Sequence, residues 1–178
     1  TEVSGTISLS ERNFLGKGQR LLFEVLTSAS NKRVKFGFTE PAFLDRDLSA
    51  NIDFTYLDLE PRQSSYTANE SSIKTGFGFS LGPDSRLTTS LKLSDEKITV
   101  PSSTGSLILK DDAGRLSNAE VSLSYVKDGR DSIIKPLSGY LFLSDLSISG
   151  LSGDYSVLKG SARGRVYKSF FNDGITIT

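Results

Sequence analysis

The sequence predicts an all-β fold: an antiparallel up-and-down transmembrane β-barrel, here an incomplete barrel of about nine or ten strands. Three observations predict it. Apolar and polar residues alternate with period two, the alternating segments are long, and short turns alternate with longer polar connections along the chain. No stretch shows a sustained period of 3.6 residues, so no long helix is expected.

The alternation is first clear at residues 33–39, where Val34, Phe36 and Phe38 are separated by charged or small residues. Successive side chains of a strand point to opposite faces, so such a segment is a strand with one apolar and one polar face. The same pattern returns, in chain order, over residues 48–56, 73–81, 87–94, 120–125 and 158–166.

Segment length favours strands that span a membrane. A tilted spanning strand needs about 9–11 residues, whereas a typical soluble strand has about 5–6. Segments long enough to span are 48–57, 71–81, 118–127, 139–148 and 157–168. Aromatic residues near the strand ends are typical of the girdles at a membrane interface: Phe14, Phe43, Tyr56, Phe79, Tyr125, Tyr140, Phe170 and Phe171. The alternation alone also fits a soluble β-sandwich with these aromatics in its core.

Two kinds of connection alternate between the predicted strands. Short turns rich in Gly, Pro, Asn and Asp are predicted at residues 16–18, 45–47, 82–84, 135–139 and 172–174. Longer polar connections are predicted at residues 28–32, 58–70, 95–117 and 149–154. Outer-membrane barrels have this asymmetry, with short turns on the periplasmic rim and longer loops outside the cell.

Composition excludes several classes of function. Lys plus Arg and Asp plus Glu both number 21, so no basic excess indicates a nucleic-acid partner. The chain has no Cys and no His, which excludes disulfides, the usual zinc and redox-metal sites, histidine bases and cysteine nucleophiles. We therefore predict no catalytic, cofactor-binding or metal-binding residue. The first residue is Thr rather than Met, which indicates a fragment or a processed chain.

Three local patterns resemble functional motifs but fit a structural role better. The run 16–18 (Gly-Lys-Gly) lacks the Gly-Lys-Ser/Thr ending of a phosphate loop, and no helix is expected after it. Two pairs of carboxylates lack the spacing of a calcium loop: Asp111 with Asp112, and Asp128 with Asp131. They are interpreted as solvated loop or turn residues, and Arg130 is expected to pair with a neighbouring carboxylate.

Charged residues occupy the polar faces of the predicted strands, where they would line the barrel lumen. Either they confer ion selectivity or, as we prefer, they pair across strands in a water-filled lumen. The cations are Arg33, Lys35, Lys74, Lys92, Arg163 and Arg165, and the facing carboxylates are Glu24, Asp53, Glu70 and Glu120.

Three strings resemble the barrel of the outer-membrane protein assembly factor (BamA) family. "GTISLSERNFLGKGQRL" (5–21) resembles its second and third strands with their turn. "KFGFTEPAFLDRDLSANIDF" (35–54) resembles the next periplasmic hairpin. "LSYVKDGRDSIIKPLSGYLFLSDLSISG" (123–150) resembles the Asp-x-Arg-Asp turn and the ninth strand, although Lys127 stands where the family has an Asp. The resemblance covers nearly the whole chain.

The resemblance implies a part of a larger barrel domain, covering roughly the second to the eleventh strand over residues 1–178. The family's N-terminal periplasmic domains, its first strand, its C-terminal strands and its Arg-Gly-Phe lid motif are expected outside these residues. The resemblance further implies that the protein is a non-enzymatic factor of the Gram-negative outer membrane that folds and inserts β-barrel proteins. Its partners would be client outer-membrane barrels, accessory assembly lipoproteins and the lipid bilayer.

Two other classes of protein stay open at this point. One is a related outer-membrane pore or a two-partner secretion barrel, and the other is a soluble β-sandwich or adhesin module. In the barrel interpretation, residues 1–178 form a curved, incomplete sheet with two unpaired edges. Because lipid cannot satisfy such edges, the 178 residues alone are not expected to form a stable membrane protein.

Overall fold

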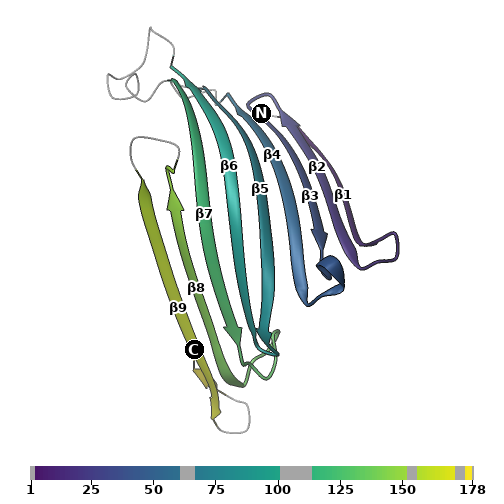
Figure 1. The fold of residues 1–178 in the computed structure, drawn as a ribbon, viewed down its shortest axis with the longest axis vertical. Helices are drawn as coiled ribbons and strands as arrows, with labels where there is room; N and C mark the ends of the chain where they lie inside the picture. The colour runs from purple at the N-terminus through teal and green to yellow at the C-terminus, as the bar shows by residue number, and fades with distance from the viewer. Residues whose placement is uncertain (1–2, 61–66, 101–113, 152–155, 171–174, 178) are drawn as a thin grey trace.

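The structure is a computed structural model that describes residues 3–60, 67–100, 114–151, 156–170 and 175–177. Within these residues the backbone forms ten strands and one short 3-10 helix (Figure 1). The elements are β1 (Ser4–Phe14), β2 (Gln19–Ser28), β3 (Asn31–Glu40), η1 (Phe43–Asp45), β4 (Leu48–Leu59), β5 (Thr67–Gly82), β6 (Ser85–Thr99), β7 (Gly114–Asp128), β8 (Ser138–Ser149), β9 (Val157–Phe170) and β10 (Ile175–Ile177).

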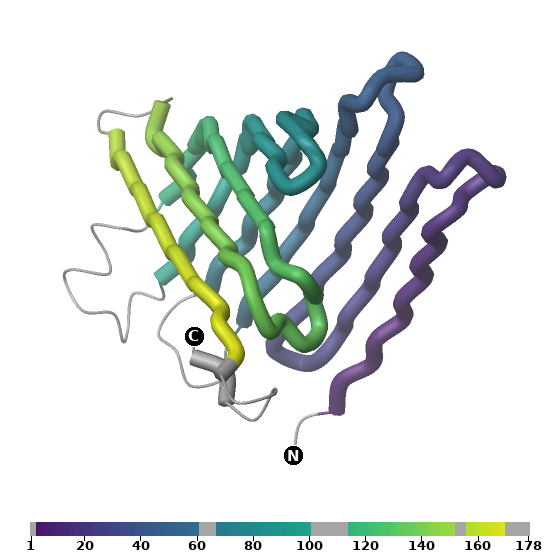
Figure 2. Tube along the Cα trace, turned by 90° about the horizontal axis from the view of Figure 1, so that it is seen from below, coloured from purple at the N-terminus to yellow at the C-terminus, as the bar shows by residue number. Residues whose placement is uncertain are grey.

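All ten strands belong to one antiparallel sheet in which each strand pairs with its neighbours in the sequence. The sheet is strongly curved, and β1 and β9 lie near its two margins (Figure 2). In the part of the chain that the structure describes, β1 and β10 are the sheet edges and do not pair with each other. The predicted all-β, up-and-down, incomplete barrel is therefore confirmed.

The strand register places the apolar residues in rows on one face of the sheet. One row runs across five strands through Phe36, Phe54, Ile73, Leu93 and Ala119, each paired directly with the next. A slip of one residue between any two strands would interrupt this row, so the period-two pattern and the register support one another.

The polar face is the concave face. Side chains on the inside of a curved sheet converge, whereas those on the outside spread apart. The described residues with the least accessible surface all belong to the polar face: Gly37, Ser72, Gly76, Gly78, Ser90 and Tyr167. Crowding there explains the glycines, because a Cβ at Gly78 would lie 2.6 Å from the Ser49 hydroxyl oxygen.

Four strands extend further than the alternation predicts. β4 reaches Leu59 and β5 begins at Thr67, inside the connection predicted at 58–70. β6 reaches Thr99 and β7 begins at Gly114, inside the connection predicted at 95–117. The predicted bounds are wrong because the outer face becomes polar at this end of the sheet, whereas Leu59, Ala68 and Ile98 lie on the concave face. The alternation is therefore interrupted, although the backbone pairing continues.

Two other connections also differ from the predicted bounds. The connection predicted at 28–32 is a hairpin of two residues, in which the Ser28 hydroxyl oxygen accepts hydrogen bonds from the backbone N–H groups of Ser30 and Asn31 (3.3 and 3.0 Å). The turn predicted at 135–139 is part of a longer connection over residues 129–137. The turn predicted at 172–174 lies outside the described residues.

Candidate functional site: the barrel wall and its turn rim

The convex face of the sheet has a continuous apolar band across its middle. Large hydrophobic side chains from nine consecutive strands are exposed there: Ile7, Leu9, Phe23, Phe36, Ile52, Phe54, Ile73, Phe77, Phe79, Leu91, Leu93, Val121, Leu123, Phe142, Leu146, Ile148, Leu158 and Val166. Monomeric soluble proteins rarely expose one continuous apolar surface of this extent. An apolar outer band with a polar interior is the arrangement of a barrel wall in lipid.

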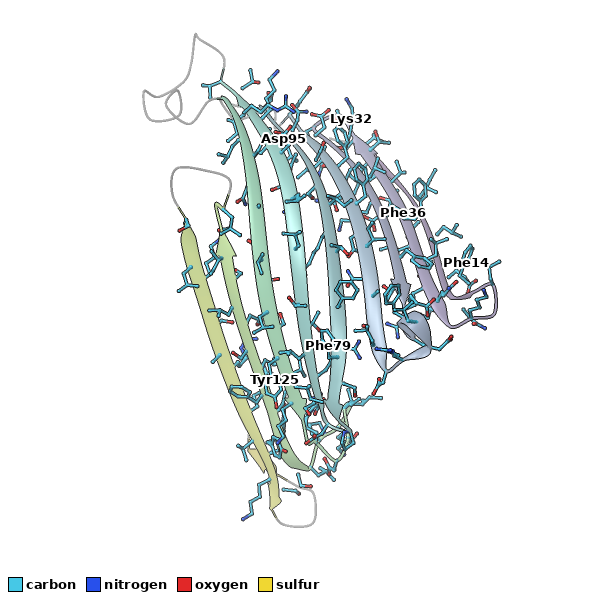
Figure 3. All side chains as sticks on the ribbon, in the orientation of Figure 1. Phe14, Lys32, Phe36, Phe79, Asp95 and Tyr125 are labelled. Carbon is cyan, nitrogen blue, oxygen red and sulfur yellow. The ribbon has the colours of Figure 1, made fainter. Side chains whose placement is uncertain are left out.

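Aromatic residues gather on this outer face at the end where the short turns lie. The labelled Phe14, Phe79 and Tyr125 lie toward that end (Figure 3). Phe43 packs against Phe77, with ring centroids 6.0 Å apart, so the β3–β4 turn leans onto the outer face. This arrangement suits an interfacial girdle. Of the other predicted girdle residues, Tyr140 is also at the turn end and Tyr56 is at the opposite end. Phe171 and the side chain of Phe170 lie outside the described residues.

Charged residues form a belt on the outer face at the opposite, loop end. Arg115 makes a two-point contact with Asp95, with Nε 2.9 Å from Oδ1 and Nη2 2.8 Å from Oδ2. Asp58 accepts a hydrogen bond from the Asn69 side-chain amide (2.6 Å) and lies 3.6 Å from the Lys32 ammonium. Lys32 and Asp95 are labelled in Figure 3. The belt marks where the apolar band ends, since desolvated charge in hydrocarbon is costly.

The concave face carries all ten charged residues that the sequence assigned to the lumen. Glu24 lies opposite Lys35, Asp53 opposite Lys74, and Lys92 opposite Glu120. Lys92 also forms an ion pair with Glu70 at 2.8 Å, the only one among these ten residues in the described part of the chain. On β8, Leu143 and Leu141 lie opposite Arg163 and Arg165, so this strand places no carboxylate directly opposite them. Arg33 lies opposite Leu26 and Leu57, and Lys74 also lies opposite Lys92. Cross-strand charge pairing therefore describes only part of β2–β7, and it does not describe the β8–β9 pair.

At the turn rim, Arg130 contacts Asp128 through two hydrogen bonds, from Nε to Oδ1 (2.7 Å) and from Nη2 to Oδ2 (2.6 Å). This is the pairing with a neighbouring carboxylate that the sequence predicted. The bond to Asp128 holds the pKa of the Arg130 guanidinium above its ordinary value. The guanidinium carbon also lies 6.0 Å from the ring centroid of Tyr167 on β9, within cation–π range.

Hydrogen bonds join this turn to neighbouring elements. The backbone N–H of Asp128 donates to the carbonyl of Asp84 (2.7 Å), and the Tyr140 hydroxyl donates to the Asp84 carboxylate (3.1 Å). Asp131 accepts a bond from the backbone N–H of Leu137 (3.0 Å). Backbone hydrogen bonding, first from Ser138 and then from Leu137, lowers the pKa of Asp131. The rim from the β5–β6 turn to β9 is therefore one connected unit.

A family model, the Omp85 superfamily domain, matches residues 13–178. The chain belongs to the Omp85 superfamily. Among solved structures, this Omp85 domain is similar to BamA from Haemophilus ducreyi lacking POTRA domains 1–3, with a TM-score of 0.69 and 15% sequence identity. That match covers 92% of this chain and 34% of the other, so the chain spans about a third of its length. At this identity the likeness shows the fold alone. No curated protein sequence matches the chain.

The Omp85 domain offers no metal site in its described part, where no three Asp or Glu side chains gather closely enough to hold an ion. No helix among the described residues is long and apolar enough to cross a membrane.

Asp111 and Asp112 lie outside the described residues. The run 16–18 lies in the hairpin between β1 and β2, where Gly16 and Gly18 have φ of 71° and 70°.

Sequence reasoning missed two features of this Omp85 domain. One is the outer polar belt, because Asp95 and Arg115 fall in a segment that had lost its alternation. The other is the link between Asp84 and Tyr140, which are 56 residues apart in the chain. Extending the period-two register of β6 past Ser94 would have placed Asp95 outside, whereas no signal in one sequence indicates the Asp84–Tyr140 contact.

Proposed function

We propose that this Omp85 domain is part of the barrel wall of an outer-membrane protein assembly factor of a Gram-negative bacterium. The whole protein would fold and insert β-barrel proteins into the outer membrane. The observation that carries the proposal is the exposed apolar convex face, which needs lipid, combined with a polar concave face in an Omp85 domain. Membership of the superfamily and the likeness to BamA support the choice among outer-membrane barrels.

We infer that further strands close the barrel. The outer edges of β1 and β10 have unpaired backbone groups in the described residues. Each such group left unsatisfied in hydrocarbon costs several kcal/mol, so an open sheet cannot persist in a bilayer. The first barrel strand, the C-terminal strands and the periplasmic domains of the assembly-factor family would supply the rest, and residues 1–178 alone would be unstable in membranes.

The mechanism of such a factor makes no covalent bonds. A free strand edge offers a row of N–H and C=O groups that can pair with a client strand, so edge pairing can template a new barrel without catalytic side chains. In the assembly-factor family this occurs at the seam between the first and last strands. Residues 1–178 would supply wall rather than seam. The partners would be client barrels and accessory assembly lipoproteins, with no cofactor.

A depletion experiment tests this function. The gene that encodes the full-length protein is placed under a repressible promoter, and folded outer-membrane barrels are quantified by their heat-modifiable migration in gels. We expect several folded barrel proteins to disappear together on depletion and to return when the wild-type gene is supplied in trans. Loss of the secretion of one partner protein, with folded barrels unchanged, would instead identify a secretion barrel and overturn the proposal.

A further inference from the structure

A shallow hollow of about 400 Å³ lies on the outer face of the sheet, where the apolar band meets the charged belt. Ser71 on β5 leaves this space, because it is a small residue between Tyr56 and Asp95, which lie opposite it on β4 and β6. On the side of the band the hollow is lined by three exposed apolar side chains: Phe54, Ile73 and Leu93. We call this feature the outer hollow.

Lys97 lies next to the outer hollow, two residues after Asp95 on the same face of β6, and it is exposed. The strands on both sides of β6 are described, and they place Asn69 and Arg115 directly opposite Lys97. Neither residue is a carboxylate, and Arg115 is a second cation. Like charges that lie directly opposite each other on a sheet destabilise it, so an anion that contacts both cations is favoured there.

The carboxylates of the belt contact other cations. Asp95 is held by the two-point contact with Arg115, and Asp58 lies 3.6 Å from the Lys32 ammonium. Among the described residues, no carboxylate oxygen lies within 4.0 Å of the Lys97 ammonium. The outer face of the belt strands therefore has one more cation than carboxylates. Cations without an ion pair also occur on the concave face, but they lie on the side of the sheet away from the apolar band.

The spacing fits the two parts of a lipid. Residues directly opposite each other have Cβ atoms about 5 Å apart, so Lys97 and Arg115 can contact one phosphate together. A guanidinium has several N–H donors, so Arg115 can hold Asp95 and contact the phosphate as well. Leu93 lies four residues before Lys97 on the same face, about 13 Å along the strand. An acyl chain that leaves the phosphate thus passes through the outer hollow as it enters the apolar band.

We propose that Lys97 and the outer hollow bind an anionic, phosphate-bearing lipid of the bilayer leaflet at the loop end. The phosphate lies between Lys97 and Arg115, and one acyl chain occupies the hollow. Charge complementarity and the position of the hollow at the edge of the apolar band carry this inference. It goes beyond the proposed function, because it requires that the outer face contacts lipid and not that the protein assembles other barrels.

Fluorescence quenching measures which lipid lies at the outer hollow. The 178 residues contain no Trp, so Tyr56→Trp introduces a reporter opposite Ser71, at the edge of the hollow. Phe23→Trp is the matched control, because Phe23 lies on the outer face of β2 with Leu9 and Phe36 opposite it. Full-length protein is reconstituted in phosphatidylcholine vesicles that contain a minor fraction of phosphatidylglycerol, and one of the two lipids has brominated acyl chains. Protein without the added Trp provides the background.

Quenching by each brominated lipid gives the preference of a position for phosphatidylglycerol over phosphatidylcholine. We expect this preference to be about fivefold higher at position 56 than at position 23. Lys97→Gln should remove most of the difference, whereas Lys97→Arg should keep it. Equal preferences at the two positions would overturn the proposal, as would a preference that survives in K97Q. Only protein that migrates as a folded, heat-modifiable species is scored, so misfolded variants do not contribute.

A change at Ser71 separates the role of the hollow from that of the charge. Ser71→Phe fills the space but leaves Lys97 and Arg115 in place, so the preference at position 56 should fall toward the control value. Ser71→Ala keeps the residue small and should keep the preference. An unchanged preference in S71F would show that charge alone attracts the lipid and would overturn the hollow as a binding site. If neither brominated lipid quenched either Trp, the outer face would not lie in lipid, and the proposed barrel wall itself would be wrong.

Discussion

Arg130 binds Asp128, two residues earlier in the chain, through two hydrogen bonds of 2.7 and 2.6 Å, and the same guanidinium lies over the ring of Tyr167 on β9. A planar, forked guanidinium can make these contacts at once, whereas an ammonium cannot. Tyr167 is only 7% exposed. The contact between Arg130 and Tyr167 therefore connects the β7–β8 turn to β9 at one of the few buried positions of the described wall.

Replacing Arg130 by Lys should loosen this turn while the sheet stays intact. The amides of Gly129 and Asp131, which donate to the carbonyls of Tyr140 and Ser138, should exchange hydrogen faster than in the wild type. Hydrogen–deuterium exchange of the full-length protein in detergent measures this. Arg46→Lys, in the β3–β4 turn, is the matched control and should change neither amide. Unchanged protection in R130K would show that the ion pair does not hold the turn.

Acidification should release the same turn through Asp131. Because the folded pKa of this carboxyl is lowered from 3.8, its contribution to stability is fully present above that value and is lost as the pH falls through the lower, folded pKa. The amide of Leu137 should lose protection as the pH falls from about 5 to about 2. The comparison is with Asp131→Asn, which cannot titrate and should show no such step once the intrinsic exchange rate is corrected. A step of equal size in both proteins would assign it to another group.

Gly139 should not tolerate a side chain. Its φ of 110° is unfavourable for any L residue, and a Cβ there would collide with the backbone of Gly129 and Arg130. Gly139→Ala should destabilise the folded barrel by more than about 1 kcal/mol, measured by urea unfolding in vesicles. Gly160→Ala is the control, because its Cβ would lie an ordinary 3.7 Å from Leu146 Cδ1. Equal midpoints for the two variants would contradict the tight approach of the turn to β8.

The sequence predicted the strands well where the two faces differ chemically. The period-two alternation alone places three residues on one face: Phe36, Phe54 and Ile73. The observed register aligns them across β3, β4 and β5. The prediction failed where the polarity of the two faces changes. Around Asp95 and Arg115 the outer face is polar and Leu116 lies on the concave face, so the segment was predicted as a loop although its backbone remains paired.

Contacts between segments that are distant in the chain could not be predicted from the sequence either. The bond from Tyr140 to Asp84 depends on how the β5–β6 turn folds against β8, which no local pattern encodes. Arg163 and Arg165 were visible in the sequence as charges on a polar face. Only the register shows that Leu143 and Leu141, rather than carboxylates, lie opposite them on β8.

A basic residue on the convex face should cost more in the middle of the apolar band than at the loop end. Leu91 and Thr99 lie on the same face of β6, but Leu91 is inside the band and Thr99 is beyond Asp95 and Lys97. Leu91→Arg should destabilise the full-length protein in vesicles by about 2–4 kcal/mol, and Thr99→Arg by about 0–1 kcal/mol. Urea unfolding followed by heat-modifiable migration gives both values. An equal loss of unfolding free energy at the two positions would contradict a lipid-facing β6. A protein that stays folded without detergent or lipid would instead be a soluble β-sandwich.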